Sequence, residues 1–89
     1  MAIELTLGAT VITPSALDAL NGADIPAALR RHASGDWGDV SPDDWSENNL
    51  SVEEGRRILS AYRDARGIKF WVITEADRSA TTVLLPEDY

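Results

Sequence analysis

Apolar and polar positions alternate with a period of two along the last third of the chain, which is typical of β-strands. Three runs show this pattern: 56–65, 68–76 and 80–89. Turn-forming residues separate the runs, and Pro86 interrupts the third because proline cannot donate a ladder hydrogen bond. We therefore predict a three-stranded antiparallel meander in the C-terminal third.

The middle run of the meander is apolar on both of its faces. Phe70 and Val72 are expected to meet the helices, so Trp71 and Ile73 point to the other side of the sheet. Either the N-terminal segment covers that second face, or the face is an exposed apolar patch of the kind that marks an interface. The pattern alone leaves both possibilities open.

The first half of the chain carries the start and stop signals of helices. Three segments have them: 13–22, 24–35 and 41–50. The first and the third begin with a Thr or Ser that can cap a helix, followed by a proline that fits the first helical position. Residues 51–55 either continue the third helix or form a separate short turn. Trp45, Asn49 and Val52 are spaced to face the core.

Two short runs that favour β-structure, 3–7 and 9–12, flank Gly8 near the N-terminus. They are consistent with one bent strand or with a small hairpin. Together the elements predict a single small α+β domain over residues 1–89. In this prediction two or three short N-terminal helices pack on the three-stranded antiparallel meander, and an N-terminal strand that joins the sheet is an open alternative.

The distribution of charge bears on function more than on fold. The net charge is −7, from 15 acidic residues and eight Lys or Arg. Residues 32–55 hold seven of the acids and no Lys or Arg, so the remaining eight acids balance the eight bases. Such a segment disfavours direct binding to nucleic acid or anionic membranes and favours a basic partner. The plainer explanation is that acids keep a small protein soluble and cluster where helices begin.

Three further observations limit the class of protein. The chain has no cysteine, which excludes disulfides, thiolate metal sites and cysteine nucleophiles. No window approaches the roughly 20 apolar residues that a membrane span needs. The N-terminus lacks the basic region of a secretory signal. We expect a cytoplasmic protein that does not bind membranes.

Patterns for catalysis and metal binding are weak. His32 is the only histidine and has Asp36 four residues on, which would suit a small hydrolase, but a lone histidine near a helix end more often packs or interacts with the helix dipole. Four aspartates in residues 36–44 are oxygen ligands, but the EF-hand spacing and the glycine motifs for phosphate are absent. We predict no enzyme activity, no cofactor and no metal site.

The acidic stretch "GDWGDVSPDDW", residues 35–45, contains two tryptophans. Trp37 lies outside every predicted element, so its ring is either a plug over the core or an exposed anchor for a partner. Asp43 and Asp44 have a structural explanation, because the positive end of a helix dipole stabilises acids in the first turn.

The turn "TEADRSATT", residues 74–82, gathers acids, an arginine and several hydroxyls. An active site would need a positioned nucleophile and base, and neither can be assigned here. As a turn, Asp77 and Ser79 are expected to bond to local backbone, and Arg78 is expected to pair with Glu75.

The run from "HASGDWGD" through "LSAYRDARGIKFWVITEADRSATTVLLPEDY" resembles a family of short, acidic, plasmid-related proteins of bacterial mobile elements. Some members of that family carry the automatic name of type I restriction enzyme subunit M. A methyltransferase subunit of that kind would need an N-P-P-[FY]-like motif and a larger cofactor-binding domain, and this chain has neither. The resemblance implies a genomic neighbourhood and supplies no functional residues.

We therefore predict a small non-enzymatic binding protein. Its acidic surface, residues 36–54, would face a basic protein partner, for example a nucleic-acid-processing or defence enzyme that it inhibits as a nucleic-acid mimic. The candidate partner-binding residues are Asp36, Trp37, Asp39, Asp43, Asp44 and Glu47. The alternative is a structural or accessory module that self-associates, or docks, through the apolar sheet face around Trp71 and Ile73, without chemistry of its own.

Overall fold

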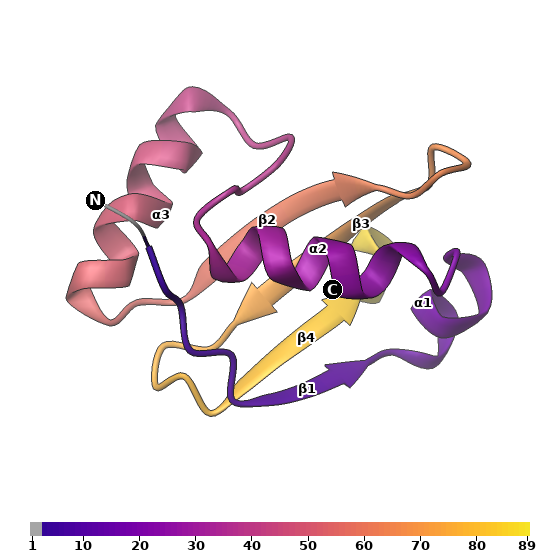
Figure 1. Cartoon of the computed structure of the whole chain (residues 1–89), viewed down its shortest axis with the longest axis horizontal. Coiled ribbons are helices and arrows are strands. Elements are labelled where there is room, and N and C mark those ends of the chain that lie inside the picture. Colours follow the sequence, from indigo (N-terminus) through magenta and orange to yellow (C-terminus); the bar gives the residue numbers. More distant parts are fainter. Residues whose placement is uncertain (1–2) are drawn as a thin grey trace.

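The computed structural model describes residues 3–89, which form a mixed four-stranded sheet, three α-helices and a C-terminal 3-10 turn (Figure 1). In chain order the elements are β1 (Ala9–Ile12), α1 (Pro14–Ala19), α2 (Asp24–Ala33), α3 (Pro42–Glu54), β2 (Ile58–Arg63), β3 (Lys69–Thr74), β4 (Ala80–Leu84) and η1 (Pro86–Asp88). The predicted α+β class is confirmed, as is the antiparallel meander of β2, β3 and β4. The sheet has four strands rather than three because β1 joins it.

Strand β1 lies parallel to β4, and the strand order across the sheet is β1-β4-β3-β2. Of the two N-terminal runs only Ala9–Ile12 is a strand, and residues 3–8 lead into it without strand pairing. The bend falls at Gly8, whose φ is 64° and where a Cβ would lie 2.4 Å from the Arg78 carbonyl oxygen. Only glycine suits both constraints.

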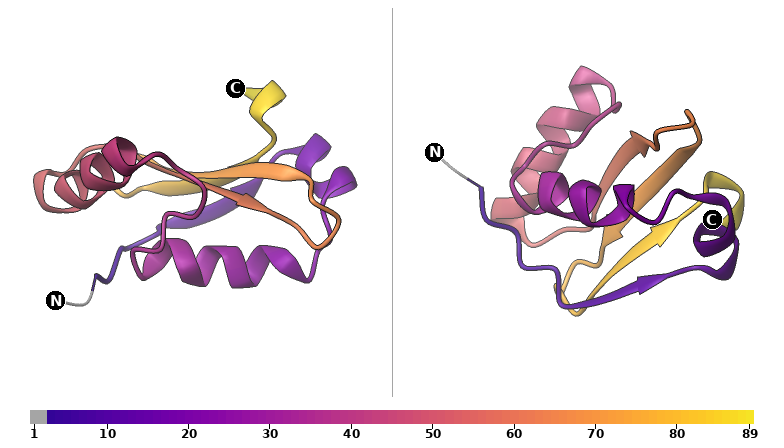
Figure 2. Two further views of the ribbon diagram at one scale, coloured as in Figure 1. Left: turned by 90° about the horizontal axis from the view of Figure 1, so that it is seen from above. Right: turned by 45° about the vertical axis from the view of Figure 1, so that its right-hand side comes forward.

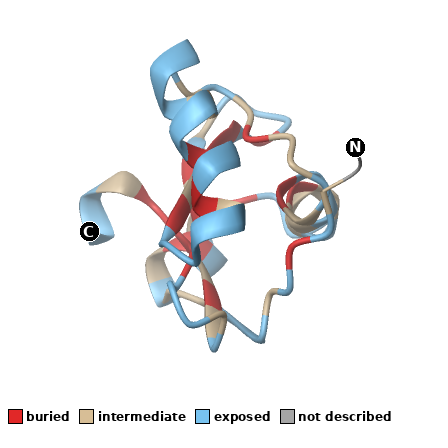
Figure 3. Ribbon diagram, turned by 90° about the vertical axis from the view of Figure 1, so that its left-hand side faces the viewer, coloured by how far each residue is buried: buried red, intermediate tan, exposed pale blue. Residues whose placement is uncertain are grey.

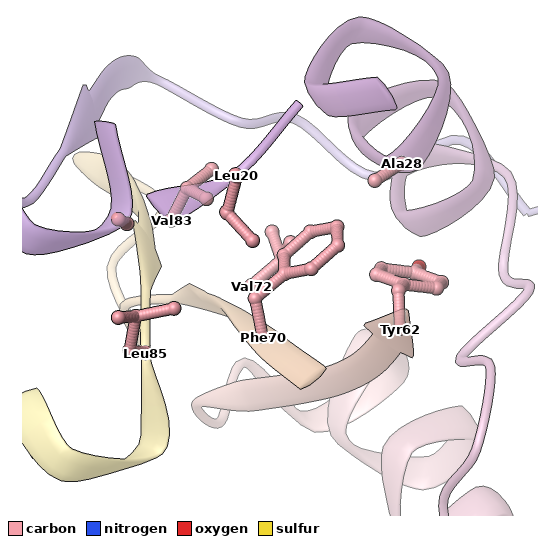
Figure 4. Packing of buried hydrophobic residues seen from close by; sticks show 8 residues of the cluster. Leu20, Ala28, Tyr62, Phe70, Val72, Val83 and Leu85 are labelled. Atoms are coloured by element: carbon pink, nitrogen blue, oxygen red, sulfur yellow. The ribbon is translucent and has the colours of Figure 1, made fainter. Parts of the chain in front are cut away.

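Helices α1 and α2 cover one face of the sheet (Figure 2). They approach it with small buried residues, Ala16 and Ala28, which let the helix backbones come close to the strands. The sheet contributes Phe70 and Val72, as the period-two pattern predicted, and Tyr62 from β2 (Figure 4). These side chains form the larger of two apolar clusters.

Helix α3 stands beside the β2 edge of the sheet, at one end of the molecule (Figures 1 and 2). A second apolar cluster fills the space between α3, the sheet and the N-terminal segment. Its buried members are Leu5, Trp37 and Ile58, and Trp45 and Val52 of α3 pack against it. Asn48 is buried on the inward side of the helix. Asn49 is exposed, but its side chain accepts a hydrogen bond from the buried Trp37 indole, so it reaches the second cluster as its spacing predicted.

On the second face of the sheet the C-terminal turn, and not the N-terminal segment, packs over one end of the strands (Figure 2). The Tyr89 ring contacts the Trp71 ring edge to face, with 5.8 Å between ring centroids, and the Tyr89 hydroxyl accepts a 2.6 Å hydrogen bond from Arg57. Ile73 and Leu84 on this face are only 4% and 6% exposed. A docking face centred on Trp71 and Ile73 therefore has little apolar surface left to offer.

Candidate acidic binding surface

The start of α3 is built as its sequence predicts. The Ser41 hydroxyl caps the helix by accepting a 3.1 Å hydrogen bond from the backbone N–H of Asp44, and Pro42 takes the first helical position. Asp43 and Asp44 lie in the first turn, where the helix dipole stabilises them. The helix runs unbroken to Glu54 and ends at Gly55 in a left-handed conformation, so residues 51–54 continue it.

The outward side of α3 carries a line of exposed residues: Asp43, Glu47, Leu50 and Glu54. Their spacing of four, three and four positions places them on one face of a helix. Leu50 is 43% exposed among these acids, and no residue of α3 is basic. The exposed residues along α3 can be followed in Figure 3. We call this line the α3 stripe.

Three arginines from outside the acidic segment fold back onto it. The ion pairs join Arg31 to Asp36 (2.7 Å), Arg63 to Asp39 (3.7 Å), and Arg56 to both Glu54 (2.7 Å) and Glu47 (3.7 Å). The charge separation seen in the sequence is therefore only partly kept in space. Within residues 3–89, the acids of the segment without a cation inside 4 Å are Asp43, Asp44 and Glu53, and all three lie on α3.

Asp36 has a structural role. Its carboxylate accepts two hydrogen bonds from the Arg31 guanidinium and one from the Gly38 N–H, and these donors hold its pKa below the ordinary value. The Arg31 guanidinium also lies over the Tyr62 ring, 4.7 Å from its centroid. A partner that binds Asp36 would have to displace this arrangement.

Trp37 is the plug and not the exposed anchor, because its side chain is 0% exposed. Its indole N–H donates a 2.9 Å hydrogen bond to the Asn49 side chain, and its ring meets His32 edge to face. The backbone on either side of Gly38, at the Trp37 carbonyl and the Asp39 N–H, pairs with Ala61 of β2. As a candidate residue for direct partner contact, Trp37 is therefore wrong.

His32 is also fully buried and belongs to a chain of hydrogen bonds. Nδ1 lies 2.5 Å from the Ser60 hydroxyl and Nε2 lies 2.8 Å from the Thr74 hydroxyl, which is 2.7 Å from that of Thr81. The Thr81 hydroxyl in turn lies 2.7 Å from the carbonyl oxygen of Leu7. The chain ties α2, three strand residues and the N-terminal segment together.

The direction of these bonds follows from the last acceptor. A carbonyl only accepts, so Thr81 donates to Leu7 and must itself accept from Thr74. Thr74 then accepts from the N–H at Nε2 of His32, and Nδ1 accepts from Ser60. Burial, with a smaller contribution from the Arg78 charge, lowers the His32 pKa to about 4, in keeping with a neutral ring. Neither ring nitrogen of His32 bonds to a carboxylate, and the ring has no access to solvent. The geometry therefore does not support a catalytic role for His32.

Arg78 is the residue that sequence reasoning missed. It is the only non-glycine residue in the described part of the chain with positive φ, at 63°. Its guanidinium does not meet the Glu75 carboxylate as predicted but donates to backbone carbonyls, at Arg56 (2.6 Å), Ser51 (2.9 Å) and Glu75 (3.2 Å). It thereby joins the β3–β4 turn to the end of α3 and fixes the orientation of the helix.

A hollow of about 200 Å³ lies between α3 and β2. It is lined by Val40, Asp44, Glu47, Asn48, Arg57 and Leu59. Its apolar residues are Val40 and Leu59, and its charged residues are two acids, Asp44 and Glu47, and one base, Arg57. This lining suits a long cationic side chain, because its alkyl stem needs apolar contact and its head group needs an acid.

Other classes of site find little support in the geometry. Among residues 3–89, no three His, Asp or Glu side chains come together in a way that could hold a metal ion. None of the helices described has the length and apolarity to cross a bilayer. No family model, no curated protein and no solved structure matches the chain. The resemblance to plasmid-related proteins therefore stays a prediction.

Proposed function

We propose that this protein is a small binding module that presents the acidic surface of residues 36–54 to a basic protein partner. The observation that carries the proposal is the α3 stripe: acids and one exposed leucine in a line on a helix without a basic residue. Charge attracts the partner over a distance, and Leu50 offers apolar contact at the centre of the line.

The hollow beside the stripe supplies a specific contact. A lysine or arginine of the partner can lay its stem on Val40 and Leu59 and reach Asp44 or Glu47 with its head group. Asp36 and Asp39 support the surface by holding the preceding loop through their arginine partners. In this proposal the contact residues are Asp43, Asp44, Glu47 and Leu50, and Trp37 acts only from inside.

The spacing of the stripe suits the groove of a nucleic-acid-processing or defence enzyme. Helix rise separates residues four apart by about 6 Å along the axis. One strand of DNA places a charge about every 3.4 Å along its axis, so the Asp43 and Glu47 carboxylates match about every second phosphate, and Leu50 interrupts this spacing before Glu54. An enzyme whose groove reads phosphates with lysine and arginine is thus a partner of fitting chemistry.

The first prediction concerns salt and charge. We expect an immobilised chain to recover a basic protein from bacterial lysate at low salt and to lose it at high salt, because the ions screen the attraction. Asp43→Asn with Asp44→Asn should weaken binding of the recovered partner, measured by titration calorimetry, by about tenfold. Duplex DNA should compete with the chain if the partner uses its nucleic-acid groove.

The matched control is Glu4→Gln with Asp18→Asn. It removes the same charge from exposed residues away from α3, so it should leave the affinity almost unchanged. Binding that responds neither to salt nor to the Asp43 and Asp44 substitutions would refute the acidic surface. A partner that binds the chain and DNA at the same time would refute binding in its nucleic-acid groove. It would still be consistent with binding through another basic surface.

A further inference from the structure

The two edges of the sheet differ in whether their outward backbone groups are hydrogen-bonded. At the β2 edge, Ala61 donates to the Trp37 carbonyl (3.1 Å) and accepts from the Asp39 N–H (2.7 Å). Two residues earlier in β2, the Asn48 side-chain amide donates a 2.8 Å hydrogen bond to the Leu59 carbonyl. The side-chain oxygen of Asn48 lies 3.5 Å from the Leu59 N–H. The outward backbone groups of Leu59 and Ala61 on this edge are thus already occupied and cannot pair with a further strand.

The β1 edge is open. In a parallel pair alternate residues bond to the neighbouring strand, and here these are the odd ones: the N–H of Ala9 donates to Ser79 and that of Thr13 donates to Val83. The N–H and C=O groups of Thr10 and Ile12 consequently point away from the sheet. Among residues 3–89 these four groups have no hydrogen-bond partner.

The only protection of this edge is the shortness of its strand, which has four residues. Residues 5–17 contain no charged side chain, and no proline interrupts Ala9–Ile12. Lysine, proline and bulges are the usual means by which exposed edges avoid pairing. Val11 is 49% exposed at the centre of the strand, and the β1 edge lies free of other elements in Figure 1.

We infer that β1 pairs antiparallel with β1 of a second copy of this chain, across a two-fold axis at Val11. In that register Thr10 faces Ile12 of the other copy, and each such pair exchanges two hydrogen bonds. All four free groups of each copy then find partners. The two Val11 side chains form the close, non-hydrogen-bonded pair at the axis, with Cα atoms about 4.5 Å apart.

A second copy suits this edge, because pairing about Val11 satisfies the free groups of both strands and brings no charged side chain of residues 5–17 to the interface. The pairing joins two four-stranded sheets into one continuous sheet of the isologous kind. Each copy contributes only the four residues of β1, so the dimer is weak and depends on concentration. The interface lies at the edge of the sheet opposite α3 and does not depend on the proposed function.

Added salt should have opposite effects on dimerisation at β1 and on partner binding at the α3 stripe. Each copy carries a net charge of −7, so the copies repel one another and added salt should strengthen dimerisation. Binding of a basic partner to the α3 stripe should weaken under the same change. Sedimentation velocity over a concentration series at low and high salt therefore measures the dimer without reporting on the stripe.

Two variants test the edge. Val11→Lys places like charges opposite each other at the axis, and Thr10→Pro removes a donor that the monomer does not use, so both should keep the fold. We expect each to weaken dimerisation at least about tenfold. In the wild-type chain, amide hydrogen exchange at Thr10 and Ile12 should slow as concentration rises, and it should stay fast in both variants.

Leu50→Lys is the matched control, since it makes the same change of charge at an exposed leucine of α3. It should leave dimerisation as in the wild-type chain and disturb only the stripe. A wild-type chain that stays monomeric at every concentration in high salt would overturn the inference. So would Val11→Lys and Thr10→Pro chains that associate as the wild-type chain does.

Discussion

At the scale of single residues, the most unusual group is His32. A buried histidine between two hydroxyls completes a chain of four hydrogen bonds, from Ser60 to the Leu7 carbonyl. Every buried side-chain polar atom in the described part of the protein has a partner. Satisfied networks of this kind specify one arrangement of the core, because any shift leaves a polar group unpaired.

The pH dependence of folding follows from the His32 pKa. This pKa is about 4 in the folded chain against an ordinary value of 6.5, so the unfolded chain binds the proton first. The free energy of unfolding should therefore fall as the pH drops from about 6.5 to about 4. Urea denaturation at a series of pH values measures this slope.

His32→Gln is the corresponding control. It removes the titration, so the slope between about pH 6.5 and about pH 4 should flatten, and it should cost about 1–3 kcal/mol at neutral pH by leaving hydroxyls unpaired. The carboxylates with lowered pKa act at lower pH, because their stabilisation is lost only as the pH falls through their own pKa values. They are Asp36, Asp64, Asp77 and Asp88. An unchanged slope in His32→Gln would contradict the assignment.

Substitutions at buried Trp37 and at exposed Leu50 should affect stability very differently. Trp37→Ala should lower the free energy of unfolding by about 3–5 kcal/mol, because it empties the centre of the second cluster. Leu50→Ala, at an exposed position of α3, should change it by less than about 0.5 kcal/mol. Chemical denaturation of the two variants checks the contrast, and a stable Trp37→Ala chain would refute the buried plug.

At the scale of elements, α3 matters most, because it leaves the sheet and offers one side to solvent. Its start is fixed by the Ser41 cap and its end by the guanidinium of Arg78. Arg78 keeps a left-handed backbone that glycine would adopt more easily. The contacts of the side chain to α3 offset this strain.

The Arg78 contribution can be split into backbone and side chain. Arg78→Gly relieves the strain but loses the guanidinium, and Arg78→Ala loses the guanidinium and keeps the strain. We expect wild type to be the most stable and Arg78→Ala the least, with about 1–3 kcal/mol between the two variants. Urea denaturation gives the order, and hydrogen exchange in the last turn of α3 reports the loss of the clamp.

Arg78→Lys tests the geometry of the group. A lysine keeps the charge but lacks the planar fork that reaches several carbonyls at once, so it should restore only part of the stability. If Arg78→Ala, which keeps the strain, were as stable as wild type, the contacts to Ser51 and Arg56 would contribute nothing, and α3 would be held by its apolar side alone.

At the scale of the whole molecule, folding redistributes the charge. The sequence places seven acids in residues 32–55 with no base among them, but Arg31, Arg56 and Arg63 return to that surface. Among the described residues, the acids of the segment that stay without a nearby cation are Asp43, Asp44 and Glu53 of α3. The proposed surface is thus narrower than the sequence suggested, and it is centred on α3 and not on residues 35–39.

The two edges of the sheet lie beside the two different contacts that we propose. One edge is closed by residues 37–39 and Asn48, and this is the edge beside α3. The opposite edge is open and uncharged. A partner at α3 and a second copy at β1 can therefore bind at the same time, and the two contacts respond to salt with opposite signs.

The sequence by itself determined the local structure. The period of two in the last third of the chain, the capped proline starts at 14 and 42 and the glycine end at 55 all appear where predicted. Each of these signals acts within a few residues, through backbone conformation, capping and the alternation of side chains. The α+β class and the inward side of β3 follow from them.

Tertiary structure alone decided the contacts between distant segments. The parallel pairing of β1 with β4, the burial of Trp37 and His32, the Arg78 clamp and the ion pair of Arg63 with Asp39 all join segments far apart in the chain. No local pattern encodes such contacts, because their free energy depends on which groups the fold brings within hydrogen-bonding or ion-pairing distance. For that reason the sequence predicted the acidic segment but not which of its residues face a partner.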